Sequence, residues 1–299
     1  MLFKKSKKID DGRSIYVKKS RMQEIWHQFQ KNKGAVVGLV MLIIIIGIAI
    51  VSGFVFDYKE DICARHAATR LIRPCLEHPF GTDQMGRSVL ARVLYGTRYS
   101  LLIGIVVVGV STGIGTMLGS IAGYYGGKVE TVIMRIVEIF MMIPNILLGI
   151  IFVAAFGISL TNLMLALGLS TVPHFARTAR SSVMTVRGNE YVEAAKAMGV
   201  SDFKIIFTHV LPNALSAILV QATTRVASAI ISAATFSFIG LGVPSPTPEW
   251  GAMLSDARQN MRDYPHLVIF PGLAIMVTVL AINLVGDGLR DALDPKLKR

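Results

Sequence analysis

Long uninterrupted runs of apolar residues dominate the chain. A helix that crosses a membrane needs about 20 mostly apolar residues, because the hydrocarbon core is about 30 Å thick and a helix rises about 1.5 Å per residue. Six segments meet or nearly meet that length: 35–56, 99–125, 132–156, 160–179, 213–241 and 267–289. The pattern therefore predicts an all-α integral membrane protein with six transmembrane helices.

Two of these runs carry breaks that refine the prediction. The third contains Pro144, and the fourth, the weakest of the six, contains Pro173 followed by His174. Prolines inside helices usually kink them. The third and fourth runs meet at Phe156-Gly157-Ile158-Ser159, so we expect a tight helical hairpin there.

Composition supports a membrane protein and excludes several other classes. The chain has 299 residues, of which 53% are hydrophobic and 17% are charged, whereas soluble domains carry about 25% charged residues. Disorder, collagen, a small disulfide scaffold and an ordinary cytosolic enzyme do not fit. The basic start of the chain precedes an apolar run longer than a signal peptide's core of about 7–15 residues, so we expect an uncleaved first helix.

The distribution of Lys and Arg predicts the orientation. With the N-terminus in the cytoplasm, the inner segments hold most of the 31 Lys and Arg. This gives a basic cytoplasmic segment at 1–34, a first span at 35–56, an extracytoplasmic loop at 57–98, a core of five spans at 99–289 and a cytoplasmic tail at 290–299. Basic tails suit anionic lipid, whereas nucleic acid would need a basic domain outside the bilayer.

The cytoplasmic loop at 188–212 has the most informative sequence. It reads as two short helices, because Gly199 is a natural helix stop and Ser201 or Asp202 can cap the next turn. Pro212 then opens the fifth span. A DNA-binding helix-turn-helix would need a supporting helix and a basic surface, which so short a loop lacks. Two rigid helices facing the cytoplasm suit docking into a groove of a partner protein.

This loop strongly resembles the EAA loop of ATP-binding-cassette (ABC) importer permeases. The matching positions are Glu193, Ala194, Ala195, Gly199, Leu211 and Pro212. The resemblance implies that the loop docks on an ATPase subunit. We expect Ala194 and Ala195 to allow close approach to that partner, and Glu193 to face a basic group on it. The consensus Ile three residues before the proline is His209 here.

Further motifs along nearly the whole chain resemble dipeptide and oligopeptide permeases, in particular the second (C-type) subunit. They are Trp26 to Gly34, Gly81-Thr82-Asp83 with Gly86-Arg87-Ser88, Pro248-Glu249-Trp250-Gly251, and Gly286 to Pro295. The family usually has Asp in place of Ser88. The resemblance implies a type I ABC importer permease fold and import of dipeptides or oligopeptides. Relatives also import glutathione or nickel chelates, and these motifs do not fix the solute.

The chain lacks the motifs of an enzyme. The nearest match to a P-loop, at Gly127-Lys128, is broken by Ala122 and Val129, and there is no HExxH or GxSxG. We therefore expect no catalytic residue, metal or cofactor in this chain. The resemblance implies partners: a second homologous permease, two ATPases that bind ATP and magnesium, and an extracytoplasmic solute-binding protein. It also implies the bacterial cytoplasmic (inner) membrane.

Arg225 lies inside the fifth span, where a charge is expensive and usually faces protein or water. It either lines the translocation path, where it can meet a peptide carboxylate, or forms a structural ion pair with another helix or subunit. Gln221, Thr223 and Thr224 favour a wet face. Near the start of the third span, Arg135 and Glu138 are spaced to form a local ion pair.

The outer loops hold the remaining candidates. Cys63 and Cys75 are the only cysteines; they can form a disulfide, stay as thiols or, with His66 and His78, bind a metal. The polar loop at 243–266 is expected to contact a solute-binding protein through Glu249, Trp250, Asp256 and Arg258. A stand-alone channel or secondary transporter is the rival function. A membrane-embedded enzyme would need convergent polar groups, and Arg225 alone stands out.

Overall fold

The computed structural model describes residues 6–10, 13–17 and 21–293 of the chain. The described elements are β1 (Ser6–Asp10), β2 (Arg13–Val17), α1 (Arg21–Lys31), α2 (Lys33–Val55), α3 (Val89–Tyr125), α4 (Gly127–Met142), α5 (Asn145–Phe156), α6 (Leu160–Arg187), α7 (Glu190–Ala197), α8 (Asp202–Ile205), α9 (Leu211–Phe238), α10 (Trp250–Ala257) and α11 (His266–Leu293). The end of the motif at Asp294-Pro295 lies outside the described residues.

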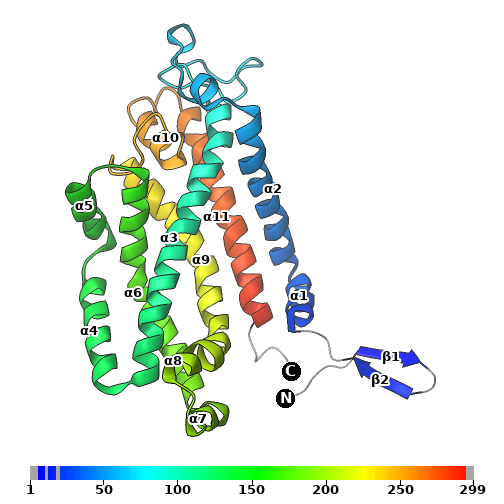
Figure 1. The fold of residues 1–299 in the computed structure, drawn as a ribbon. Helices are drawn as coiled ribbons and strands as arrows, with labels where there is room; N and C mark the ends of the chain where they lie inside the picture. Colours follow the sequence, from blue (N-terminus) through cyan, green and yellow to red (C-terminus); the bar gives the residue numbers. More distant parts are fainter. Residues whose placement is uncertain (1–5, 11–12, 18–20, 294–299) are drawn as a thin grey trace.

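A bundle of long helices forms the body of the molecule (Figure 1). By length and composition, α2, α3, the continuous stretch Asp202–Phe238 and α11 are able to cross a membrane, and α4 with α5 adds a fifth span if the bent pair counts as one. The chain is thus a multi-pass membrane protein. The fourth predicted span, α6, is 28 residues long but carries Arg177, Arg180 and Arg187 in its last turns.

The second span starts earlier than the apolar run suggested. Helix α3 begins at Val89, inside the segment assigned to the outer loop at 57–98, and Ser88 caps it by accepting a hydrogen bond from the Ala91 N–H. The charges of Arg92 and Arg98 kept this start out of the predicted apolar run. Arg92 is 1% exposed and donates to the carbonyl oxygens of Ile62 and Pro246 at 2.9 and 3.0 Å, so its charge is accommodated within the helix.

The third predicted span is two helices rather than one. Helices α4 and α5 meet at Pro144 with a bend of 89°, because a proline lacks the N–H of the helical ladder and restricts the residue before it. The predicted hairpin after α5 is confirmed: α5 ends at Phe156, Gly157 has φ 83°, and Ser159 caps α6.

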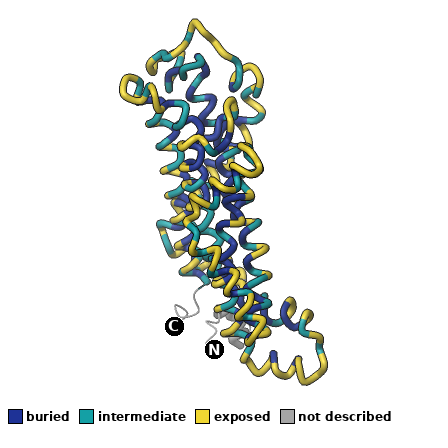
Figure 2. Tube along the Cα trace, turned by 90° about the vertical axis from the view of Figure 1, so that its left-hand side faces the viewer, coloured by how far each residue is buried: buried dark blue, intermediate teal, exposed yellow. Residues whose placement is uncertain are grey.

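The core lies between α3, α6, α9 and α11, and buried stretches run along the length of the bundle while its end loops are mostly exposed (Figure 2). Helices α3 and α6 are closest at Gly115, Gly119 and Gly123 of α3. A Cβ at Gly119 would lie 2.2 Å from the Ala176 carbonyl oxygen. Such contact of small residues is typical of membrane helix pairs.

The two ends of the bundle differ. The antiparallel hairpin of β1 and β2 is a departure from the all-α prediction, and it lies with α1, α7 and the end of α11 at one end (Figure 1). There Asn32 donates a 3.0 Å hydrogen bond to Asp291, linking the start of α2 to α11. The loop that precedes α3 and the helix α10 form the opposite end.

Candidate functional site: the coupling tip and a polar cavity

Helix α7 ends in a Schellman motif. Gly199 has φ 77°, its N–H donates to the Lys196 carbonyl at 3.0 Å, and the Val200 N–H donates to the Ala195 carbonyl at 3.2 Å. These two bonds satisfy carbonyls that a helix end leaves without a partner. The predicted stop at Gly199 is confirmed, and it fixes the direction in which the chain leaves α7.

The second predicted helix is not separate from the fifth span. Helix α8 continues through a π-helical turn, Ile206–Val210, directly into α9. The Leu211 N–H donates to the Ile206 carbonyl. Because Pro212 has no N–H and its ring crowds the carbonyl four residues earlier, the wider turn before it is expected. Helices α8 and α9 therefore belong to one continuous 37-residue helical stretch, Asp202–Phe238.

We call residues 188–212 the coupling tip. Its inner side packs on the bundle through Val192, Ala195, Ile205 and Val210, which cluster with Val183 and Ala214. Ala195 is 3% exposed, so its small size serves packing within the chain, which corrects the expectation that it faces a partner. Glu193, Ala194 and Pro212 are exposed, and Leu211 is partly buried.

The outer side of the coupling tip exposes large apolar side chains. Met198 and Phe203 are 77% and 72% exposed. The rings of Phe203 and Phe207 lie 4.6 Å apart. Exposed apolar side chains gathered at one place mark an interaction surface.

Polar contacts tie the coupling tip to the bundle. The Tyr124 hydroxyl donates to Asp202 at 2.7 Å, and Arg187 donates to the carbonyls of Gly123 and Tyr124 at 2.8 and 3.2 Å. Nearby, Arg180 of α6 pairs with Glu130 at the start of α4. The expected pair of Arg135 with Glu138 is present at 3.1 Å.

A polar cavity of about 200 Å³ lies among α3, α5, α6 and α9, and Arg225 lines it. Within the described part of the chain no carboxylate pairs with Arg225. Gln221, one turn earlier, does not line the cavity, and Thr223 and Thr224 pack on Gly286 of α11 instead.

Sequence reasoning missed the other polar groups of the cavity, which are Asn145, Ser170, Thr171, Ser228, Ser232 and Thr235. A signal for some of them was present. Arg225, Ser228, Ser232 and Thr235 recur at intervals of three and four residues, so they share one face of α9.

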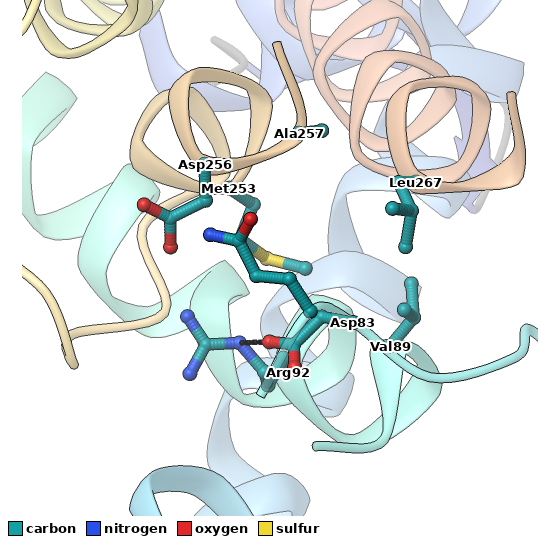
Figure 3. A pocket seen from close by; sticks show the side chains of 8 residues that line it. Asp83, Val89, Arg92, Met253, Asp256, Ala257 and Leu267 are labelled. Atoms are coloured by element: carbon teal, nitrogen blue, oxygen red, sulfur yellow. Dashed lines mark ion pairs between the residues drawn. The ribbon is translucent and has the colours of Figure 1, made fainter. Parts of the chain in front are cut away.

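Charged residues hold together the end of the bundle opposite the coupling tip. Asp83 accepts from Arg87 at 2.6 Å and lies 3.6 Å from Arg92, and Arg87 lies 3.5 Å from Asp256 of α10. Figure 3 shows Asp83 and Arg92 facing each other below α10. The cavity there is only about 20 Å³, room for a single water, so this cluster fastens the outer loop to α10. Burial raises the pKa of Asp256, against the opposing effect of Arg87.

Two residues expected to face a binding protein are instead buried. Trp250 is 1% exposed, and its indole N–H donates to the Val93 carbonyl at 2.9 Å. Glu249 is also 1% exposed and caps α10 by accepting from the N–H groups of Gly251 and Ala252 at 2.9 and 2.8 Å. Burial raises the pKa of Glu249. Arg258 is exposed and packs over Phe238.

Of the three alternatives for Cys63 and Cys75, the structure has the free thiols, with Cys63 partly buried and Cys75 exposed. Among the described residues, Cys63, His66, Cys75 and His78 do not assemble into a group able to hold a metal ion.

Comparison with known proteins bears on both ends of the chain. Residues 115–299 match the family described as "Binding-protein-dependent transport system inner membrane component", and residues 20–73 match the "N-terminal TM domain of oligopeptide transport permease C". A chain of the MetNI methionine ABC transporter in inward-facing conformations has a similar fold, with a TM-score of 0.56, 20% identity, and coverage of 68% of this chain and 96% of that one.

Relatives with curated names resemble nearly the full length. The dipeptide transport system permease protein DppC of Alkalihalophilus pseudofirmus is 45% identical over 95% of this chain and 92% of its own. DppC of Escherichia coli strain K12 is 44% identical over 93% and 94%. The glutathione transport system permease protein GsiD of Pectobacterium atrosepticum is 43% identical over 92% and 91%. With a family match over more than half of its length, this chain belongs to the inner membrane components of binding-protein-dependent transport systems.

Proposed function

We propose that the chain is the C-type permease subunit of a type I ABC importer that moves dipeptides or oligopeptides inward. The observation that carries this is the 40–45% identity to dipeptide permeases over more than nine-tenths of the chain. The apolar, rigidly capped coupling tip adds a physical argument, because it is a surface suited to a partner's groove.

The proposed machine has further parts. A second homologous permease completes the pore, two ATPase subunits bind ATP and magnesium, and a solute-binding protein delivers solute from outside. This chain performs no ATP hydrolysis. Closure of the ATPases would push or pull the coupling tip, and the π-turn junction would pass that motion to α9. A ligand-biased two-state element of this kind is what alternating access requires.

The proposed topology has six spans, with α4 and α5 as one broken span and α6 as another, and with both chain ends in the cytoplasm. The coupling tip lies at the same end of the bundle as β1, β2 and α1, which carry Lys7, Lys8, Arg13, Arg21 and Lys31. This agrees with the rule that positive charge collects on the cytoplasmic side.

Glutathione is the second candidate solute, because the glutathione permeases are nearly as similar as the dipeptide permeases. Uptake of labelled dipeptide, glutathione and nickel should be measured in cells with and without this chain. Loss of dipeptide uptake alone on deletion is the expected result. Loss of only glutathione or nickel uptake would replace the solute and keep the architecture, and unchanged uptake of all three would contradict the proposal.

A further inference from the structure

Two separate sources of positive potential meet at the cavity beside Arg225. One is the guanidinium itself, near the middle of α9. The other is the start of α5, since Asn145 and Ile146 line the same cavity. Within the described chain, the N–H groups of Asn145, Ile146 and Leu147 have no hydrogen-bond partner. A helix start carries a partial positive charge and attracts anions.

The break at Pro144 is what brings this helix start to the cavity. Without the 89° bend, α4 and α5 would form one continuous helix, and these N–H groups would bond within it. Half-helices that begin inside a bundle are a recurrent way to present N–H groups to an anionic solute.

The rest of the wall is polar but not acidic. Ser170 and Thr171 donate to the Leu167 carbonyl, and Thr235 donates to the Ile231 carbonyl. The oxygens of these hydroxyls can still accept hydrogen bonds. None of the described residues that line the cavity is Asp or Glu. At about 200 Å³ the cavity is smaller than a complete site for a small molecule, about 300–1,000 Å³, which fits a site that a facing subunit completes.

We propose that this cavity binds the α-carboxylate of the peptide during its passage, with Arg225 as its main ligand and the start of α5 as the second. This rests on the proposed function in that the solute is a peptide. Arginine suits the role because its planar fork binds a carboxylate through two parallel hydrogen bonds. Passage would then favour peptides with a free C-terminus, independently of any selection by the binding protein.

The test is binding to the complete permease–ATPase complex in nanodiscs, without nucleotide and without the binding protein. Saturation-transfer NMR detects weak binding of Ala-Ala, with Ala-Ala amide as the probe that lacks the carboxylate. Wild type should bind Ala-Ala at least about tenfold more tightly than the amide. Arg225→Gln should abolish that difference, and Arg225→Lys, which keeps the charge but loses the fork, should lie between them.

Arg135→Gln is the matched control, because Arg135 is 77% exposed and lies away from the cavity. It should bind like wild type. Absence of Ala-Ala binding by wild type, equal binding of acid and amide, or an unchanged preference in Arg225→Gln would each overturn the inference. If dipeptide uptake in cells still depends on the chain, any of these results would refute the carboxylate site and leave the proposed function intact. Failure of the inference is therefore distinguishable from failure of the proposed function.

Discussion

The Tyr124 hydroxyl donates a 2.7 Å hydrogen bond to Oδ1 of Asp202 and so joins the last turn of α3 to the first residue of α8. Arg187, at the end of α6, binds the carbonyls of Gly123 and Tyr124. The ends of α3 and α6 are thus fastened to the coupling tip, so under the proposed function we expect movement of the tip to reach three helices rather than α9 alone.

Removing the hydroxyl should loosen the tip without unfolding it. Tyr124→Phe loses one hydrogen bond to a charged group that remains partly solvated, which costs about 1 kcal/mol. Amides in residues 199–205 should exchange about fivefold faster, measured by hydrogen-exchange mass spectrometry on the complex. Tyr125→Phe, next to it but without a hydrogen bond to Asp202, is the control. Equal exchange in all three proteins would show that the bond does not stabilise the tip.

A bulky residue at Gly199 should abolish uptake while the chain still inserts. Gly199 has φ 77° and its Cβ position is open, so the effect of Gly199→Val is conformational, about 1–2 kcal/mol or more for a branched side chain at positive φ. The Schellman motif would open and α8 would change direction. The measurement is dipeptide uptake normalised to the amount of chain in the membrane.

Gly188 provides the control in the same loop. It has a negative φ of −85° and open space at its Cβ position, so Gly188→Ala should transport normally. Normal uptake by Gly199→Val would refute a role for the shape of the tip in coupling.

The contact of α3 with α6 should tolerate no methyl group at Gly119. The added Cβ would lie 2.2 Å from the Ala176 carbonyl oxygen and 2.7 Å from the Ala179 Cβ, and overpacking of this kind costs about 1–3 kcal/mol. Gly119→Ala should lower the apparent Tm of the detergent-purified complex by several degrees. Gly113→Ala on the same helix meets nothing within 4 Å and should not lower it; equal Tm values for both would contradict the packing account.

Glu249 should make the stability of the outer end depend on pH. Because burial raises its pKa in the folded state, the folded protein holds this proton over a range where the unfolded chain has lost it. The contribution of Glu249 to stability therefore falls as pH rises from the ordinary carboxyl pKa to the raised one. Thermal unfolding of the complex followed across that range should show the decline.

Glu249→Gln should remove that pH dependence and lower stability by about 1–3 kcal/mol, since an amide NH₂ cannot accept from the N–H that faces it. Glu60→Gln, at an exposed position of the outer loop, should change neither. A Glu249→Gln complex with the wild-type pH profile would show that another group titrates there.

Local sequence signals predicted much of the coupling tip. The helix formers at 190–198, the glycine at 199 and the proline at 212 act through backbone geometry, which depends on neighbours in the chain. The continuous junction of α8 with α9 was not predicted. The π-turn there accommodates Pro212 within a helix that continues through it, and no local sequence signal marks such a turn. The burial of Ala195 was not predicted, because a small side chain suits packing within the chain as well as close approach to a partner.

Long-range contacts explain the other differences. The start of α3 at Val89 depends on Ile62 and Pro246, whose carbonyls accept from Arg92 and lie far away in sequence. The burial of Glu249 and Trp250 likewise depends on α3, since Gly96 leaves room for the Pro248 carbonyl. The polar residues around Arg225 come from three helices. Only those on α9 recur at a spacing that can be recognised in the sequence.

The most direct test of the account is accumulation of labelled dipeptide in proteoliposomes that contain this chain, the second permease and the two ATPases. Binding protein is supplied outside the vesicles, at the face opposite the coupling tip, and ATP at the ATPase face. We predict accumulation above the external concentration only when ATP and all subunits are present. Dipeptide entry through this chain alone, without ATPases or ATP, would contradict the account and identify a self-sufficient channel or secondary transporter.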